Sequence, residues 1–308
     1  MMQRMKEAAL LQSAALSYGA AATGSGDAHS TGDRERELNE DAVYEYSDQA
    51  RNGEGIGLYL VCDGFGGHQN GRAASHLAAQ TIVDALLPVL HADEWSARPE
   101  NSATSPTLLQ QSVKAAVREA NEAVWHLARS GPRAARTMQT ALTRGVVAGD
   151  LAHIANVGHG RVYVWRAGRV QQLTQDDSVA ALLAELGHIG ESEIAGHPRR
   201  KMLLRSIGQK EEVSVDLFKW WLQPGDRMLL CSDGLWNAFS DREELAGYLG
   251  AASTPAEICQ EMVDEARERD GSDDVSAVVV AVSGVAEQEG NLLWQKIVPA
   301  GVASQLAL

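Results

Sequence analysis

Two stretches that lie far apart in the chain end in the same way, and they decide the fold. YLVCDGFGGH (residues 59–68) and MLLCSDGLWN (residues 228–237) each contain an apolar run followed closely by Asp-Gly. Short apolar runs bounded by turn residues are typical of buried strands, and glycine-rich ends favour tight turns. Each stretch therefore predicts a buried strand with an aspartate at its end, Asp63 in the first and Asp233 in the second.

Outward from these two strands, the pattern predicts many short strands and few helices. Further strands are expected at 42–46, 140–148, 151–157, 161–166, 169–173, 212–218 and 275–282, and helices at 1–14, 72–91, 107–129 and 255–269. The two-residue connections 149–150 and 167–168 are typical of β-hairpins.

This order lacks the regular alternation of strand and helix that builds a doubly wound parallel sheet. It predicts an α+β fold, a four-layer α-β-β-α sandwich whose central antiparallel β-sandwich is flanked by helices. Residues 176–206 contain several charges and glycines, which indicates an irregular or partly helical flap. We expect an N-terminal extension at 1–18, one domain at 19–285 and a C-terminal appendage at 286–308.

Composition excludes several classes of function. The 308 residues include 27 Lys and Arg against 41 Asp and Glu, which gives a formal net charge of −14. So acidic a chain lacks the basic face that nucleic acids require, and it is not attracted to anionic lipids. There is no uncharged apolar run as long as the 18 or so residues of a membrane span. We therefore expect no nucleic acid and no membrane as partners.

The N-terminus and the cysteines indicate the compartment. The first residues form an amphipathic stretch with an internal charge, unlike a signal peptide. Cys62, Cys231 and Cys259 are odd in number, and apolar neighbours favour buried, reduced thiols over disulfides. We therefore expect a cytoplasmic protein, and a monomer.

Two further acidic residues adjoin expected strands. Asp41 precedes AVYEY, and Asp273 lies in GSDDVSAVVVAV. A carboxylate at the tip of a buried strand needs a cation or hydrogen bonds. Carboxylates and carbonyls are the ligands that Mg²⁺ and Mn²⁺ prefer, and the glycine at position 64 would let its carbonyl approach a metal closely. Since a single Asp-Gly is more often a simple turn, the inference depends on the number and order of these motifs.

The ordered set of motifs resembles the metal-dependent protein phosphatases (the PPM family, protein phosphatase 2C type), and their compact bacterial members in particular. The matching segments, which span about residues 20–283, are RELNEDA at 36–42, VCDGFGGHQNG at 61–71, RAAS at 72–75, residues 154–178, LLRSIG at 203–208, PGDRMLLCSDGLW at 224–236 and GSDDVSAVVVAV at 271–282.

The resemblance implies a binuclear Mn²⁺ or Mg²⁺ centre that hydrolyses phosphoserine and phosphothreonine in proteins. Asp63 would bridge both metals, and the Gly64 carbonyl would bind one of them. Asp233 and Asp273 would hold the other metal. A water bridging the metals would attack phosphorus, so no nucleophilic Cys or Ser is expected.

The N-terminal motif completes the site that the resemblance implies. Glu40 and Asp41 would anchor water molecules bound to the metals, which makes Asp41 part of the metal centre. Arg36 would bind the substrate phosphate, because a planar guanidinium matches phosphate geometry. The implied partners are phosphorylated proteins, the targets of a Ser/Thr kinase and the kinase itself.

The sequence departs from the family pattern near the site. The usual Gly-Asp-Ser-Arg is Gly-His-Gly-Arg at 158–161, which leaves binding of a third metal open. His159 could be a ligand or an exposed turn residue, and we favour the turn. Asp-His-Ser becomes Asp-Asp-Ser at 176–178, and Asp-Asn becomes Asp-Asp at 273–274. Phe65 replaces a histidine of animal members, whereas His68 is expected to be structural.

An alternative from another class is a non-catalytic or partner-dedicated regulator that keeps the fold and binds a phosphoprotein. The presence of Arg36 and of the four aspartates argues against it, since a decayed site would have lost at least one of them.

Overall fold

The computed structural model describes residues 10–18, 39–50, 54–67, 69–92, 108–239, 241–270 and 272–283. Its strands are β1 Leu10–Tyr18, β2 Ala42–Gln49, β3 Gly55–Phe65, β4 Gln139–Ala148, β5 Leu151–Val157, β6 Arg161–Arg166, β7 Arg169–Gln172, β8 Asp216–Trp221, β9 Arg227–Cys231 and β10 Val275–Ser283. They form two five-stranded antiparallel sheets, one in the order β1-β10-β9-β6-β7 and the other in the order β2-β3-β4-β5-β8.

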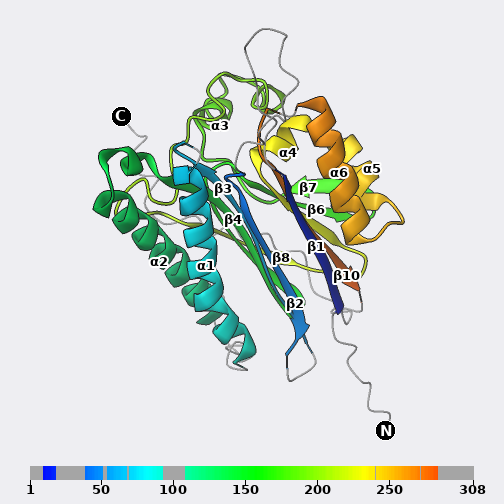
Figure 1. Ribbon diagram of the computed structural model, residues 1–308. Helices are drawn as coiled ribbons and strands as arrows, with labels where there is room; N and C mark the ends of the chain where they lie inside the picture. Colours follow the sequence, from blue (N-terminus) through cyan, green and yellow to red (C-terminus); the bar gives the residue numbers. More distant parts are fainter. Residues whose placement is uncertain are drawn as a thin grey trace, which may run out of the picture.

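The helices cover the outer faces of the two sheets, except α3 (Val179–Glu185), which lies in the segment 176–206 (Figure 1). They are α1 Gln69–His91, α2 Leu108–Ser130, α3 Val179–Glu185, α4 Asp233–Ala238, α5 Arg242–Gly250 and α6 Pro255–Arg269. Figure 1 shows α1 and α2 on one side of the paired sheets and α4, α5 and α6 on the other. The expected four-layer α-β-β-α sandwich is therefore confirmed.

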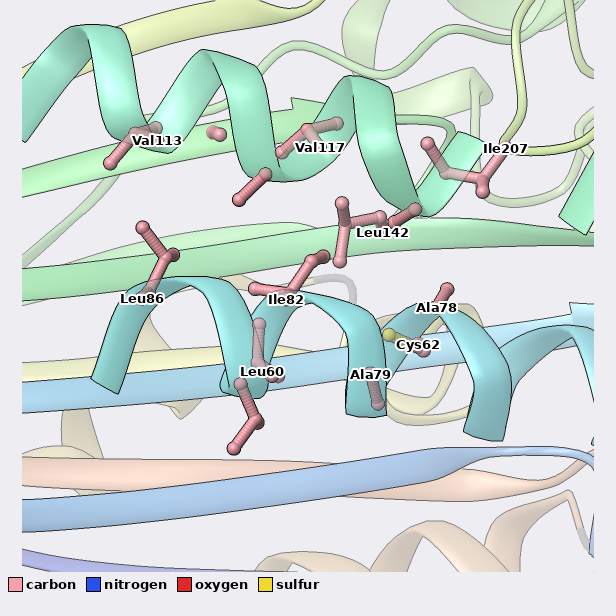
Figure 2. Packing of buried hydrophobic residues seen from close by; sticks show 14 of the residues in the cluster. Leu60, Cys62, Ala78, Ala79, Ile82, Leu86, Val113, Val117, Leu142 and Ile207 are labelled. Carbon is pink, nitrogen blue, oxygen red and sulfur yellow. The ribbon is translucent and has the colours of Figure 1, made fainter. Parts of the chain in front are cut away.

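Three apolar cores hold the four layers together. Alternate residues of β3 enter different cores, because side chains on a strand point to opposite faces in turn. Leu60 faces α1 and α2, whereas Tyr59 and Val61 lie between the two sheets. Figure 2 shows the first core, where Ile82 and Leu86 of α1 lie close to Leu60 and Leu142 on the sheet below.

The described cysteines are all free and buried within cores. Cys62 lies under α1, and Cys231 and Cys259 pack in the core between the other sheet and α6. Burial raises the pKa of each thiol, most of all because the charged thiolate would lose its hydration. The expected buried thiols are confirmed.

Among the described helices, α1 is long and apolar enough to cross a membrane. Packing explains that composition, because Ala74, Ala78, Ile82 and Leu86 on one face of α1 are buried in the first core.

The N-terminal prediction was wrong where the structure describes it. Leu10–Tyr18 is a strand paired along its whole length with β10, not part of a helix over 1–14. The alanines and leucines of this segment favour helix locally, but an open edge beside the valine-rich β10 gives them a partner, and strand pairing prevails. A domain boundary at residue 19 would cut this strand from its sheet. The predicted appendage at 286–308 lies outside the described residues.

The strand predicted at 212–218 is shifted toward the C-terminus. β8 runs from Asp216 to Trp221, in register with β5 from Asn156 to Leu151. Pairing with β5 sets these limits, and it draws Trp220 into the core between the sheets. The short helices α4 and α5 lacked a periodic signal long enough to predict them.

Candidate metal centre

Antiparallel pairing brings the acidic strand ends to one edge of the sandwich. Ala42 at the start of β2 pairs with Cys62 near the end of β3, so Asp41 and Asp63 are neighbours. In the other sheet, Cys231 at the end of β9 pairs with Ala277 near the start of β10. Asp41 and Asp63 from one sheet, and Asp233 and Asp273 from the other, therefore lie at the same edge of the sandwich.

A buried hydrogen bond joins the two sheets at this edge. The Ser276 hydroxyl on β10 donates to Asp41 Oδ2 over 2.6 Å. The backbone amide of Ser276 is held in turn by the Ser232 hydroxyl at 3.0 Å. Asp41 is therefore fixed by the opposite sheet, while its Oδ1 has no hydrogen-bond partner among the described residues.

Asp63, His159 and Asp233 converge in the middle of the edge. His159 Nδ1 lies 3.9 Å from Asp63 Oδ2, and His159 Nε2 lies 3.6 Å from Asp233 Oδ2. One potential ligand atom from each residue lies within 4.8 Å of the others. The two carboxylate oxygens and His159 Nδ1 are buried and lack hydrogen-bond partners among the described residues.

Asp273 and Asp274 flank this group. Lys201, from the segment 176–206, forms an ion pair with Asp273 Oδ2, and its Nζ lies 4.0 Å from Asp233 Oδ2. Asp274 Oδ2 accepts a hydrogen bond of 2.7 Å from the backbone amide of Glu40. The predicted extra carboxylate at position 274 thus orders the segment that carries Glu40 and Asp41.

The clustered carboxylates perturb one another. Burial raises the pKa of Asp41 and Asp63 well above the ordinary value, and neighbouring aspartates raise it further. Burial alone would raise the pKa of Asp233, but the neighbouring His159 and Lys201 lower the pKa of that carboxyl below its ordinary value. Such a group of buried anions is stable only with a cation or with bound protons.

The end of β3 lies tight against the start of α1. A Cβ atom at Gly64 would lie 2.2 Å from the carbonyl oxygen of Gly71 and 2.5 Å from that of Glu40. A Cβ atom at Gly71 would lie 2.2 Å from Glu40 Oε1. The glycines thus let the Glu40 segment, β3 and the first turn of α1 come together beside the acidic group.

Gly64→Ala is expected to destabilise the protein by about 3 kcal/mol, because the new methyl group meets backbone atoms that cannot move independently. Urea denaturation measures the change. Gly247→Ala is the matched control, since a Cβ atom there meets nothing within 4 Å and alanine favours the helix α5. Equal stability of both variants would contradict the tight approach.

The turn at 158–161 points His159 into the site. Gly158 has a φ of +109°, a conformation that favours glycine. The Trp236 indole donates a hydrogen bond of 2.9 Å to the His159 carbonyl. His159 is 5% exposed, so the exposed turn residue that we favoured from sequence is wrong. The local sequence could not show that Trp236, which is distant in the chain, packs against this turn.

The residues at 176–178 anchor the flap to this turn. Asp176 accepts hydrogen bonds from Arg161 Nε at 2.9 Å and Nη2 at 2.7 Å. Asp177 accepts one of 3.0 Å from the Gly158 amide, and it also pairs with Arg205. The Ser178 hydroxyl caps α3. The altered Asp-Asp-Ser motif therefore fixes the flap at its base.

The structure brings together Asp41, Asp63, Asp233 and Asp273, with Gly64 and Glu40 beside them. Arg36 and His68 lie outside the described residues. His159, Lys201 and Ser276 join the group without having been predicted to do so. The departure from the family pattern at position 159 could have pointed to His159. Nothing in the irregular segment 176–206 distinguished Lys201 from the other charged residues there.

The donor set fits divalent metal ions. The buried carboxylate oxygens of Asp63 and Asp233 lie close to the imidazole of His159, and Asp41 carries a third buried oxygen; none of these oxygens has a hydrogen-bond partner among the described residues. Oxygen ligands suit Mg²⁺ and Mn²⁺, and the imidazole adds a ligand favoured by later transition metals.

Comparisons with known proteins agree with this architecture. The family model described as protein phosphatase 2C matches residues 26–268. The serine/threonine phosphatase stp of Listeria innocua is 31% identical over 226 residues, which cover 72% of this chain and 83% of that protein.

Two solved structures are similar throughout the sandwich. The serine/threonine phosphatase PstP/Ppp of Mycobacterium tuberculosis has a TM-score of 0.67 and 29% identity, and the alignment covers 89% of this chain and 99% of that one. The catalytic domain of a PstP in complex with two manganese ions has a TM-score of 0.66 and 27% identity, with the same coverage. The fold, the acidic edge and the family match together show that this chain belongs to the protein phosphatase 2C family.

Proposed function

We propose that this protein is a metal-dependent protein-serine/threonine phosphatase that hydrolyses phosphoserine and phosphothreonine in other proteins. The convergence of Asp41, Asp63, Asp233 and Asp273 at one edge of the sandwich carries the proposal. The relatives are named serine/threonine phosphatases, and one of them holds two manganese ions. Nothing in the site favours a non-catalytic regulator, because every predicted aspartate lies where it could act.

We assign the acidic residues to different roles in metal and water binding. Asp63 on β3 would be shared by the two ions, and the Gly64 carbonyl would be a further ligand of one of them. Asp233 and Asp273 would hold the other ion. Ser276 orients Asp41 through its buried hydrogen bond, so that Asp41 and Glu40 can hold ordered water.

When bound, Mn²⁺ or Mg²⁺ would supply an activated water and would offset charge on the phosphoryl oxygens. We assign Arg36 to the substrate phosphate, because a guanidinium group is a bidentate partner for phosphate oxygens. The flap base at Asp176 and Asp177 lies beside the same edge and would limit how a phosphopeptide enters.

We further propose that the substrates are targets of a Ser/Thr kinase, and that the kinase itself is among them. The free buried thiols support a reducing, cytoplasmic location. The acidic composition supports the absence of nucleic acid and membrane partners.

Phosphate release from a phosphothreonine peptide tests the proposed activity. We expect turnover with Mn²⁺, a loss to background with excess EDTA, and recovery when Mn²⁺ is restored. Activity that persists in EDTA would contradict the metal-dependent mechanism. Metal binding without turnover of any phosphopeptide or p-nitrophenyl phosphate would favour the regulator.

The stability of the metal-free protein is expected to fall as the pH rises above about 4, the ordinary pKa of an aspartate. The unfolded chain releases the protons of Asp41 and Asp63 near pH 4, whereas their raised pKa in the folded protein keeps the protons bound to a higher pH. The folded state therefore binds more protons across this window, and its advantage is lost as pH rises through the folded pKa.

Thermal unfolding of chelator-treated protein at several pH values measures this dependence. Asp63→Asn should flatten the fall, because the asparagine cannot ionise. Mn²⁺ at 100 times its dissociation constant should stabilise the native protein by about 2.7 kcal/mol at pH 7. A metal-free protein whose stability rose more steeply with pH than that of Asp63→Asn would contradict the prediction.

A further inference from the structure

The feature that neither the family match nor the expected binuclear centre explains is the imidazole of His159. It replaces the aspartate of the family's Gly-Asp-Ser-Arg turn, and it lies buried between two of the clustered carboxylates. A buried histidine nitrogen normally has a hydrogen-bond partner. His159 Nδ1 has none among the described residues.

The spacing of the atoms fits a shared ion. Two ligand atoms at about 2.1 Å from one ion can be at most about 4.2 Å apart. His159 Nε2 lies 3.6 Å from Asp233 Oδ2, and His159 Nδ1 lies 3.9 Å from Asp63 Oδ2. Both distances exceed a hydrogen bond. Since one imidazole offers a single nitrogen to a given ion, the shorter distance, between Nε2 and Asp233 Oδ2, is the one that fits two ligands on one ion.

The backbone of the turn that carries the imidazole is also held in place before any ion binds. Trp236 fixes the His159 carbonyl at 2.9 Å, and Asp177 fixes the adjacent Gly158 amide at 3.0 Å. The Trp236 ring in turn stacks against the Arg161 guanidinium, whose Cζ lies 3.6 Å from the centroid of the ring. A ligand on so constrained a turn loses little conformational freedom when it binds a metal.

We propose that His159 Nε2 is a metal ligand beside Asp233, and that it makes this edge of the centre prefer transition-metal ions to Mg²⁺. This rests on the proposed metal-dependent function. Imidazole nitrogen binds zinc and other transition metals well, whereas Mg²⁺ prefers oxygen ligands. His159 Nδ1 then faces the Asp63 carboxylate at 3.9 Å, beyond hydrogen-bond range.

Metal binding and its spectrum test the proposal without any assay of turnover. Dissociation constants for Mn²⁺, Zn²⁺ and Mg²⁺ would be measured by calorimetry on the whole chain and on His159→Asn. Pulsed electron paramagnetic resonance on the Mn²⁺-loaded protein would detect a ¹⁴N nucleus bound to the ion. His188→Asn, an exposed histidine on the flap, is the matched control.

We expect His159→Asn to weaken Zn²⁺ binding at least tenfold relative to Mg²⁺ and to abolish the ¹⁴N coupling. His188→Asn should change neither. His159→Asp should bind Mg²⁺ and Mn²⁺ through oxygen and still lack the ¹⁴N signal, which excludes simple loss of folding as the cause.

Two failures are distinguishable. If Mn²⁺ binds and phosphopeptide is hydrolysed, but the ¹⁴N coupling is absent or survives His159→Asn, this inference is overturned and the phosphatase function stands. If no divalent ion binds the native protein, the metal-dependent function fails and the inference fails with it.

Discussion

Asp233→Asn is expected to lower kcat/KM for a phosphothreonine peptide by more than about 100-fold. Removal of a residue that only orients a metal ligand typically costs 10–100-fold, and Asp233 lies among the proposed ligands themselves. Its Oδ2 is buried, 3.6 Å from His159 Nε2 and 4.0 Å from Lys201 Nζ. The amide keeps the shape of the side chain but loses the charge that an ion requires.

Steady-state hydrolysis at saturating Mn²⁺ measures this loss, and thermal unfolding with and without Mn²⁺ shows whether binding has failed. Asp264→Asn on the exposed face of α6 is the control, because it removes a half-exposed carboxylate whose contacts are with Gln260 at 2.6 Å and Arg267 at 3.7 Å on its own helix. We expect it to keep full activity. An Asp233→Asn protein with activity within about threefold of the native level would place the chemistry elsewhere.

Arg144→Met is expected to stabilise the protein by about 2–4 kcal/mol. Arg144 on β4 lies opposite Leu60 of β3 and Ala155 of β5, on the face that packs against α1 and α2. It is 0% exposed, and none of its guanidinium nitrogens has a hydrogen-bond partner among the described residues. Burial lowers its pKa to about 9.

The pKa of a nearby histidine also reflects the apolar surroundings between this sheet and the helices α1 and α2. His153 on β5 is buried, and burial, followed by the charges of Lys219 and Arg144, lowers its pKa to about 3. An unpaired buried charge costs several kcal/mol, and an apolar side chain of similar volume removes that cost. At about 2–4 °C per kcal/mol for a domain of this size, the melting temperature should rise by several degrees.

Arg161→Met is the matched control for a buried arginine. Arg161 forms a bidentate pair with Asp176, so its loss leaves that carboxylate buried and unpaired and should cost about 3–5 kcal/mol. Calorimetric unfolding of both variants in the same buffer gives the comparison. An Arg144→Met protein that melts below the native protein would show that Arg144 is stabilised in a way these contacts do not reveal.

Much of the fold was predictable because its elements carry local signals. The alternating or continuous apolar runs of β3, β4 and β9 and the periodic faces of α1 and α2 were all present in the sequence. β1 was missed because its local preference for helix is overridden by pairing with β10. β8 was misplaced because its limits are set by register with β5 rather than by its own residues.

For the site, the chain by itself determined the chemistry: four acidic strand ends in a fixed order, two of them followed by glycine, predicted a divalent-metal centre. Only the tertiary structure decided which residues complete it. His159, Lys201 and Ser276 reach the acidic edge from a turn, a flap and the opposite sheet, and none is close in sequence to Asp63. The physical reason is that a sequence pattern records which face of an element is buried, whereas the register and packing of two sheets determine which side chains share that buried space.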